Sequence, residues 1–335
     1  MRTLDRPHAR HITLMVLATA LIAAVGVAPA PATASVGRGG LTWILQQPPK
    51  SPPNRAAPAM AFDPAVGKVV LFGGYDRGGY LDDTWTWDGF RWRPVATSAA
   101  PPARAGAGMA YDGVTGQLVL FGGYDGSAHL GDTWAFDAAT RSWIQQQPAH
   151  GPRKETGAML FTDPLDGHVD MFGGFDGMLY SNATWRWTGS DWNRLRTTDA
   201  PAARSAAATG LDPETGQVVL FAGLGSLRTD DTWTWDGKRW TPRSPTQQPP
   251  WRFYAAADVV PSLGGVVMFG GASPDGDLGD TWLWTGSDWT ELSPATSPSP
   301  RESAAVAYDP ASGELVLVGG QSFGKLSHET WTLAG

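Results

Sequence analysis

The sequence contains no cysteine among its 335 residues, and it is poor in histidine and in charge. The absence of cysteine excludes disulfides, cysteine-ligated metals and a thiol nucleophile. With 25 Lys and Arg against 32 Asp and Glu, the net charge is −7. The chain therefore lacks the basic excess that binding to nucleic acid or to an anionic membrane surface requires, and we expect neither kind of partner.

The first 34 residues differ in composition from the rest of the chain. Three arginines precede an almost wholly apolar stretch from Ile12 to Ala28, and Ala32-Thr33-Ala34 fits a small-x-small cleavage site. This pattern predicts a signal peptide over residues 1–34, with a retained membrane anchor as the alternative. We expect a secreted, cell-surface or periplasmic protein with no membrane span after cleavage, whose folded domain is residues 35–335.

Tryptophan recurs with a period of about 50 residues. Six copies follow one another in steps of 49, 51, 49, 48 and 49 residues, at Trp43, Trp92, Trp143, Trp192, Trp240 and Trp289. Each repeat also has an apolar run that ends on a small pair such as Gly73-Gly74, followed by a Thr-Trp pair such as Thr84-Trp85. Of the 17 tryptophans only Trp251 falls outside this repeat. A period of this length is typical of four-stranded blades arranged around an axis, so the sequence predicts an all-β, six-bladed β-propeller.

Residues 55–96 show the strands of one blade. An Ala-rich first strand is followed by the turn sequence DPAVGK, an apolar second strand VVLFGG, a third strand DTWTW and a fourth strand that contains Trp92. Small side chains in the first strand indicate that this strand lies nearest the axis. Leu41-Thr42-Trp43 is a fourth strand with no blade before it, and Thr330–Leu333 is a third strand with nothing after it. We therefore expect the N-terminal strand to complete the sixth blade, because closure removes the sheet edges.

The double-glycine strand end, the D-T-W-x-W segment and the trailing tryptophan resemble the kelch repeat, and the likeness covers about residues 41–335. Kelch propellers include galactose oxidase, bacterial sialic-acid mutarotases and many binding scaffolds, so the resemblance implies a fold rather than an activity. Galactose oxidase depends on a cysteine-crosslinked tyrosine with copper, which a chain without cysteine cannot form.

One set of candidate binding residues lies 12 positions after each repeat tryptophan, in the loop that enters the first strand. Five copies have arginine and the third has glutamate: Arg55, Arg104, Glu155, Arg204, Arg252 and Arg301. These side chains predict a site for an anion or an acidic sugar, because the guanidinium group forms paired bonds with carboxylates. The alternative is a structural bridge to the acidic residue before each Thr-Trp pair, since the blade that has Glu155 also has Ala183 in place of that acid. Glu155 is also a weak candidate for a general acid or base.

A second set of candidates lies in the loops that leave the second strands. Blades one to three have an aromatic residue beside a carboxylate, at Tyr75-Asp76, Tyr124-Asp125 and Phe175-Asp176. Such pairs suit a sugar or a basic peptide, although the aromatic rings also suit packing on a neighbouring blade. Trp251 is a further candidate anchor on the same face.

No metal site and no cofactor is predicted, because the histidines lie in different blades without ligand spacing. We expect a monomeric, non-catalytic module that binds an extracellular protein or glycan through these loops. The alternative is an enzyme acting on an acidic sugar, similar to the sialic-acid mutarotases.

Overall fold

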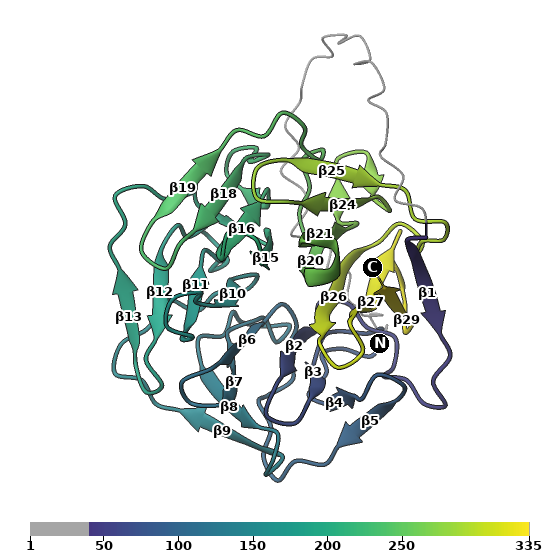
Figure 1. The fold of residues 1–335 in the computed structure, drawn as a ribbon. Coiled ribbons are helices and arrows are strands. Elements are labelled where there is room, and N and C mark those ends of the chain that lie inside the picture. The colour runs from purple at the N-terminus through teal and green to yellow at the C-terminus, as the bar shows by residue number, and fades with distance from the viewer. Residues whose placement is uncertain (1–39, 335) are drawn as a thin grey trace, which may run out of the picture. The chain divides into compact units, whose positions relative to one another are not determined.

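The computed structural model describes residues 40–334, so the predicted signal peptide over residues 1–34 lies outside the described residues. Strands β1 to β29 and one short 3-10 helix (Pro261–Leu263) make up the regular structure of this range. Six sheets surround a common axis, as predicted from the tryptophan period (Figure 1).

Each of the first three blades is an antiparallel sheet of four strands that are neighbours in space in chain order. Blade one contains β2 (Ala59–Asp63), β3 (Lys68–Phe72), β4 (Thr84–Trp87) and β5 (Trp92–Val95). Blade two contains β6 (Gly108–Asp112), β7 (Gln117–Phe121), β8 (Thr133–Asp137) and β9 (Ser142–Gln146). Blade three contains β10 (Met159–Thr162), β11 (Val169–Phe172), β12 (Thr184–Trp187) and β13 (Trp192–Leu195).

The other three blades repeat this plan and add short strand pairs in their loops. Blade four contains β15 (Ala208–Asp212), β16 (Gln217–Phe221), β18 (Thr232–Trp235) and β19 (Trp240–Arg243). Blade five contains β20 (Ala256–Val260), β21 (Gly265–Phe269), β24 (Thr281–Trp284) and β25 (Trp289–Leu292). Blade six contains β26 (Glu302–Asp309), β27 (Glu314–Ser322), β29 (Thr330–Ala334) and β1 (Thr42–Gln46). The added pairs are β14 (Arg204–Ser205) with β17 (Leu224–Gly225), β22 (Ala272–Ser273) with β23 (Gly276–Asp277), and β28 (Lys325–Leu326) with β27.

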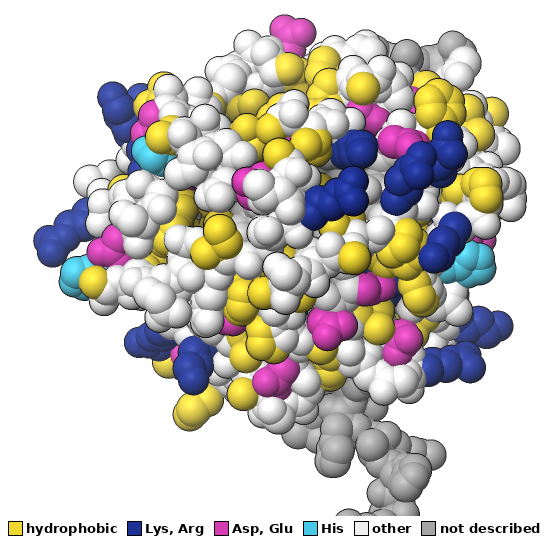
Figure 2. Space-filling model, turned by 90° about the horizontal axis from the view of Figure 1, so that it is seen from below, with side chains coloured by type: hydrophobic (Ala, Val, Ile, Leu, Met, Phe, Trp, Pro, Cys, Tyr) yellow, Lys and Arg dark blue, Asp and Glu magenta, His cyan; other side chains and the backbone are white. Residues whose placement is uncertain are grey.

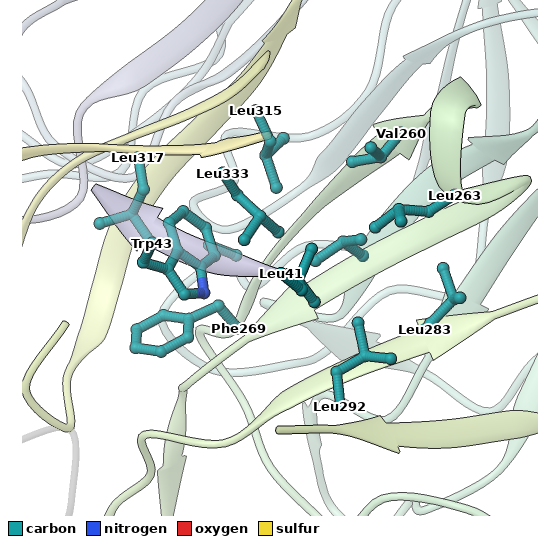
Figure 3. Packing of buried hydrophobic residues seen from close by; sticks show 12 residues of the cluster. Leu41, Trp43, Val260, Leu263, Phe269, Leu283, Leu292, Leu315, Leu317 and Leu333 are labelled. Carbon is teal, nitrogen blue, oxygen red and sulfur yellow. The ribbon is translucent and has the colours of Figure 1, made fainter. Parts of the chain in front are cut away.

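The ring is closed by the N-terminal strand, as predicted. Strand β1 pairs antiparallel with β29, and Trp43 lies opposite Leu333. The side chains of Leu41 and Trp43 pack among residues of blades five and six, including Phe269 and Leu317 (Figure 3). Trp43 is only 1% exposed, so the first described strand is part of the core.

The repeat tryptophans also join each blade to the one before it. The indole Nε1 of each donates a hydrogen bond of 2.9–3.2 Å to the threonine that begins the third strand of the preceding blade. The pairs are Trp92 with Thr330, Trp143 with Thr84, Trp192 with Thr133, Trp240 with Thr184, Trp289 with Thr232, and Trp43 with Thr281. All six junctions therefore carry the same buried bond, and the last one depends on the N-terminal strand.

The first strands line a central cavity of about 470 Å³. Its wall is made mostly of small or apolar residues, which confirms that the Ala-rich strands lie nearest the axis. The turns that follow the first strands have the predicted aspartate geometry: the Ala65 N–H donates to Asp63 at 2.9 Å. These turns lie at one end of the cavity, and the loops that carry the candidate binding residues lie at the other, which we call the loop face.

The outer surface is mixed in charge. Seen from below the view of Figure 1, Lys and Arg side chains stand at separate places with Asp and Glu between them (Figure 2). Within residues 40–334, no helix is long and apolar enough to cross a bilayer.

Candidate functional site

Each arginine of the first loops forms a buried ion pair inside its own blade. In blade one, the Nη1 and Nη2 atoms of Arg55 donate to the two carboxylate oxygens of Asp83 at 2.7 and 2.8 Å. The same guanidinium group also donates to the carbonyl oxygens of Pro53 and Gly73. Because the Trp85 indole donates to Asp83 as well, at 2.6 Å, the arginine, the acid and the third strand form one hydrogen-bonded unit. We call this unit the loop bridge.

Five blades contain the loop bridge. The pairs are Arg55–Asp83, Arg104–Asp132, Arg204–Asp231, Arg252–Asp280 and Arg301–Glu329, with shortest N–O distances of 2.6–2.7 Å. The five arginines are 0–3% exposed. Burial acts to raise the pKa of each paired acid, but the bonds and charge of the arginine hold it below its usual range. The five guanidinium groups are thus buried in bridges within their own blades, as the structural alternative describes, and are not exposed on the loop face.

The main chain of the same loop residues also joins neighbouring blades. The Gly74 N–H donates to the carbonyl of Arg104 at 2.8 Å, and Arg104 N–H donates to the carbonyl of Leu81. Gly73 has φ of 66°, and a Cβ there would lie 2.7 Å from the Arg104 carbonyl oxygen. Glycine at position 73 is therefore favoured both by the backbone conformation and by the close approach of the next blade, and blade four has Ala222 at this place with φ of 57°.

Blade three keeps the main-chain bonds but lacks the loop bridge. The Glu155 N–H donates to Leu130 O and the Gly123 N–H donates to Glu155 O, both at 2.9 Å. The Glu155 side chain is only 3% exposed, and its Oε2 atom has no hydrogen-bond partner among the described residues. Burial raises the pKa of Glu155 to about 7, a shift opposed by a hydrogen bond with Ser181.

The predicted aromatic residues of the exit loops belong to a longer row. Tyr75, Tyr124 and Phe175 are joined by three residues that the sequence analysis did not select, Tyr80, His129 and Tyr180. Successive rings in the order Tyr75, Tyr80, Tyr124, His129, Phe175 and Tyr180 have centroids 4.7–6.3 Å apart. We call this row the aromatic arc. It extends over blades one to three, and each of its members is partly exposed.

The acidic partners of these aromatics shape their own loops. Oδ1 of Asp76 accepts from the N–H groups of Gly78 and Gly79, and Asp125 and Asp176 make the same kind of bonds. The backbone N–H bonds hold the pKa of Asp125 and of Asp176 below the usual range. One oxygen of each acid thus fixes the loop, and Asp176 also pairs with Arg153 at 3.3 Å.

Trp251 lies between blades four and five. Its indole donates to the carbonyl of Gly223 at 3.0 Å, and its ring lies 5.6 Å from Phe253 and 5.7 Å from the guanidinium carbon of Arg228. The side chain is partly buried against the core cluster of these blades. It therefore packs at a blade junction, with part of its surface on the loop face.

A closed ring of backbone hydrogen bonds surrounds the loop-face end of the cavity. One residue from each blade, two positions after the arginine or glutamate, donates its N–H to the carbonyl of its counterpart in the preceding blade at 2.8–3.0 Å. The six residues all have φ between 51° and 66°: Ala57, Gly106, Gly157, Ala206, Tyr254 and Ser303. We call this ring the collar. Five of its members are small, and only Tyr254 carries a large side chain.

Tyr254 belongs to a polar cluster at the collar that the sequence analysis missed. Gln321 donates to Glu302 at 2.6 Å and accepts from the Tyr75 hydroxyl at 2.9 Å. Burial, followed by the nearby Glu302, Tyr180 and Tyr75, raises the pKa of Tyr254. Burial and Glu302 also raise the pKa of Tyr75 to about 12. Hydrogen bonds join Tyr75, Gln321 and Glu302, and electrostatic effects link Tyr180, Tyr75 and Glu302 to Tyr254. We call these five residues, from blades one, three, five and six, the mouth cluster.

A comparison of the repeats would have detected one member of this cluster. The collar position holds Ala, Gly, Gly, Ala and Ser in five repeats and Tyr254 in the fifth blade. The histidines do not assemble into a site: His129 lies in the aromatic arc, and His328 bonds Asn54. In residues 40–334, no group of three or more His, Cys, Asp or Glu side chains is arranged to hold a metal ion.

Comparison with known proteins supports the fold. Residues 40–188 match the family model of the KLHDC2/KLHL20/DRC7 Kelch-repeats domain. Among solved structures, that of YjhT superposes with a TM-score of 0.67 at 16% sequence identity, covering 86% of this chain and 99% of that chain. At this identity the likeness concerns the fold alone. No curated protein matches the chain.

Proposed function

We propose that this six-bladed β-propeller, in which residues 40–188 match a Kelch-repeats family model, is a non-catalytic module that binds an extracellular protein or glycan through its loop face. In this proposal the N-terminal segment directs export, and the propeller acts outside the cell as a monomer. Kelch propellers commonly bind other proteins, which agrees with this role.

The aromatic arc is the observation that carries the proposal. Six partly exposed rings in contact across three blades offer a continuous surface of apolar faces edged by hydroxyl groups. Aromatic side chains of this kind dominate binding surfaces because they bury a large area with little loss of conformational entropy. The carboxylates of Asp76, Asp125 and Asp176 lie beside the arc and add hydrogen-bond acceptors for sugar hydroxyls or for basic residues of a peptide.

An array of glycans and peptides probed with the purified protein tests this proposal. Tyr124 is the best position to change, because its ring contacts both Tyr80 and His129 in the middle of the arc. We expect Tyr124→Ala to remove the bound signals of the wild type. The matched control is Phe90→Ala, which removes an 82% exposed ring from a turn on the opposite face. Loss of signal with Phe90→Ala alone, or an unchanged profile with Tyr124→Ala, would contradict the proposal.

An enzyme acting on an acidic sugar is the second candidate, and the pKa of Glu155 favours it. A carboxyl group with a pKa of about 7 suits proton transfer near neutral pH. The loop bridges oppose this candidate, because their five guanidinium groups are already paired and are not available to hold the acid group of the sugar. Turnover of acidic sugars followed by NMR, and its loss in Glu155→Gln, would replace the binding role with a catalytic one.

A further inference from the structure

The mouth cluster contains a carboxylate without a cationic partner. Glu302 accepts one hydrogen bond from Gln321 through Oε1, and its Oε2 atom has no hydrogen-bond partner among the described residues. Burial, and to a smaller extent the negative charge of Asp277, raise the pKa of Glu302 against the hydrogen bond from Gln321. A partly buried acid beside a second acid is stabilised by an added positive charge.

The main chain of Tyr254 lies beside the start of the strand that contains Glu302. The Ser303 N–H donates to Tyr254 O at 3.0 Å, so the collar brings Tyr254 next to the strand that begins with Glu302. A bulky residue with φ of 55° is strained, and such residues are concentrated at functional sites. The Tyr75 hydroxyl bonds Gln321, the partner of Glu302, and both Tyr180 and Tyr75 act electrostatically on Tyr254.

The cavity below the collar carries no positive charge. No lysine or arginine is among the residues that line it, and Asp258 is its one carboxylate. Alanine, glycine and methionine make up much of the wall. The surroundings therefore favour a ligand with a cationic head and a small apolar body, and they disfavour an anion.

We propose that the mouth cluster binds a compact organic cation, a quaternary or methylated ammonium group, held by Glu302 and by the rings of Tyr75, Tyr180 and Tyr254. Aromatic rings combined with a carboxylate attract such cations because the ring faces carry negative charge density and the ammonium group is weakly hydrated. This site goes beyond the proposed function, since it takes a small ligand at the axis whether or not the aromatic arc binds a macromolecule.

Calorimetric titration of the purified protein with choline and with tetramethylammonium tests the inference. The matched neutral ligand is 3,3-dimethyl-1-butanol, which has the shape of choline without its charge. We expect both cations to bind and the neutral alcohol to bind at least about tenfold more weakly, as a desolvated cation–aromatic contact predicts.

Two variants locate the site. Glu302→Gln removes the charge and keeps the shape, and Tyr254→Ala removes the ring at a position where Ala57 and Ala206 already adopt the same backbone conformation. Each change should weaken choline binding by about tenfold. Asp275→Asn, an exposed acid on the same face, is the control and should leave the affinity unchanged.

Three results would overturn the inference: no heat of binding with either cation at millimolar concentration, equal binding of the neutral alcohol, or equal losses in Asp275→Asn and Glu302→Gln. Because the ligands are small and the arc is unaltered in these variants, failure here is separate from failure of the array experiment with Tyr124→Ala.

Discussion

Restoring the missing loop bridge in blade three should stabilise the protein. The change is the double substitution Glu155→Arg with Ala183→Asp, which gives this blade the pair found in the other five. The main chain around residue 155 makes the same hydrogen bonds as the main chain around Arg104. The backbone at residue 155 therefore has the geometry found where the other blades have arginine.

The expected gain follows from the state of Glu155. Its pKa rises from the ordinary 4.5 to about 7, so at pH 8 its ionised form costs about 3 kcal/mol in the folded state, at 1.36 kcal/mol per unit. Removing this carboxylate and adding a bidentate pair should therefore raise the free energy of unfolding by about 3 kcal/mol at pH 8. The melting temperature should rise by several degrees, since about 1 kcal/mol corresponds to about 2 °C in a domain of this size.

The two single variants, together with the wild type and the double variant, form a double-mutant cycle. Glu155→Arg alone leaves a buried cation without its acid, and Ala183→Asp alone adds a carboxylate beside Glu155. Each single change should destabilise relative to the double one, with a coupling energy of about 3–5 kcal/mol. Urea unfolding followed by tryptophan fluorescence measures all four proteins. A coupling energy near zero would refute the view that the loop bridge is a paired unit.

The gain should also depend on pH in a defined direction. A carboxyl group whose pKa is raised in the folded state binds its proton more tightly there, so stability is lost as the pH rises from about 4.5 to about 7 and the penalty is constant above that. At pH 5.5 the penalty falls to about 1 kcal/mol. The double variant should therefore gain less stability over the wild type at pH 5.5 than at pH 8. An equal gain at both pH values would show that the ionisation of Glu155 is not the cause of the difference in stability.

Two further substitutions test closure and the regular bridges. Trp43→Ala removes the buried ring and its hydrogen bond to Thr281. The free energy of unfolding, measured by urea titration, should fall by about 3–5 kcal/mol. A loss below about 1 kcal/mol would mean that β1 is not needed for closure of the ring. Asp83→Ala leaves the buried guanidinium group of Arg55 unpaired and should lower the free energy of unfolding by about 3–5 kcal/mol. The control Asp275→Ala removes an exposed acid and should change the melting temperature little. Equal effects of the two substitutions would contradict the structural role of the pair.

The fold was predictable because its determinants repeat. The spacing of Trp43, Trp92 and their counterparts reports the length of one blade, and the isolated Leu41–Trp43 segment indicates where the ring closes. The joint loss of arginine and acid at Glu155 and Ala183 also supported the loop bridge, because a buried pair is retained or lost together. Residues that recur at the same position of each repeat therefore occupy equivalent positions in the six blades.

The candidate site was predictable only in part, because its contacts join loops of different blades. Tyr75, Tyr124 and Phe175 share one repeat position. Tyr80, His129 and Tyr180 share another, five residues later, and each pairs with the first aromatic of its own loop. The repeat therefore marks all six residues, but it does not show that the loops of neighbouring blades bring their rings together. No spacing in the chain shows that Gln321 bonds Tyr75 from 246 residues away. Whether an arginine in a loop faces solvent or its own blade is likewise decided by the fold of that loop, which local sequence does not determine.

The six bonds of the collar all point the same way around the axis, so every amide and carbonyl in it is already used. A ligand that enters the opening inside the collar finds no free main-chain donor or acceptor among the collar residues. Selectivity between ligands at this opening therefore depends on side chains. Four blades place a side chain at this position and two place a glycine, so the residue types at these six positions determine which groups line the aperture.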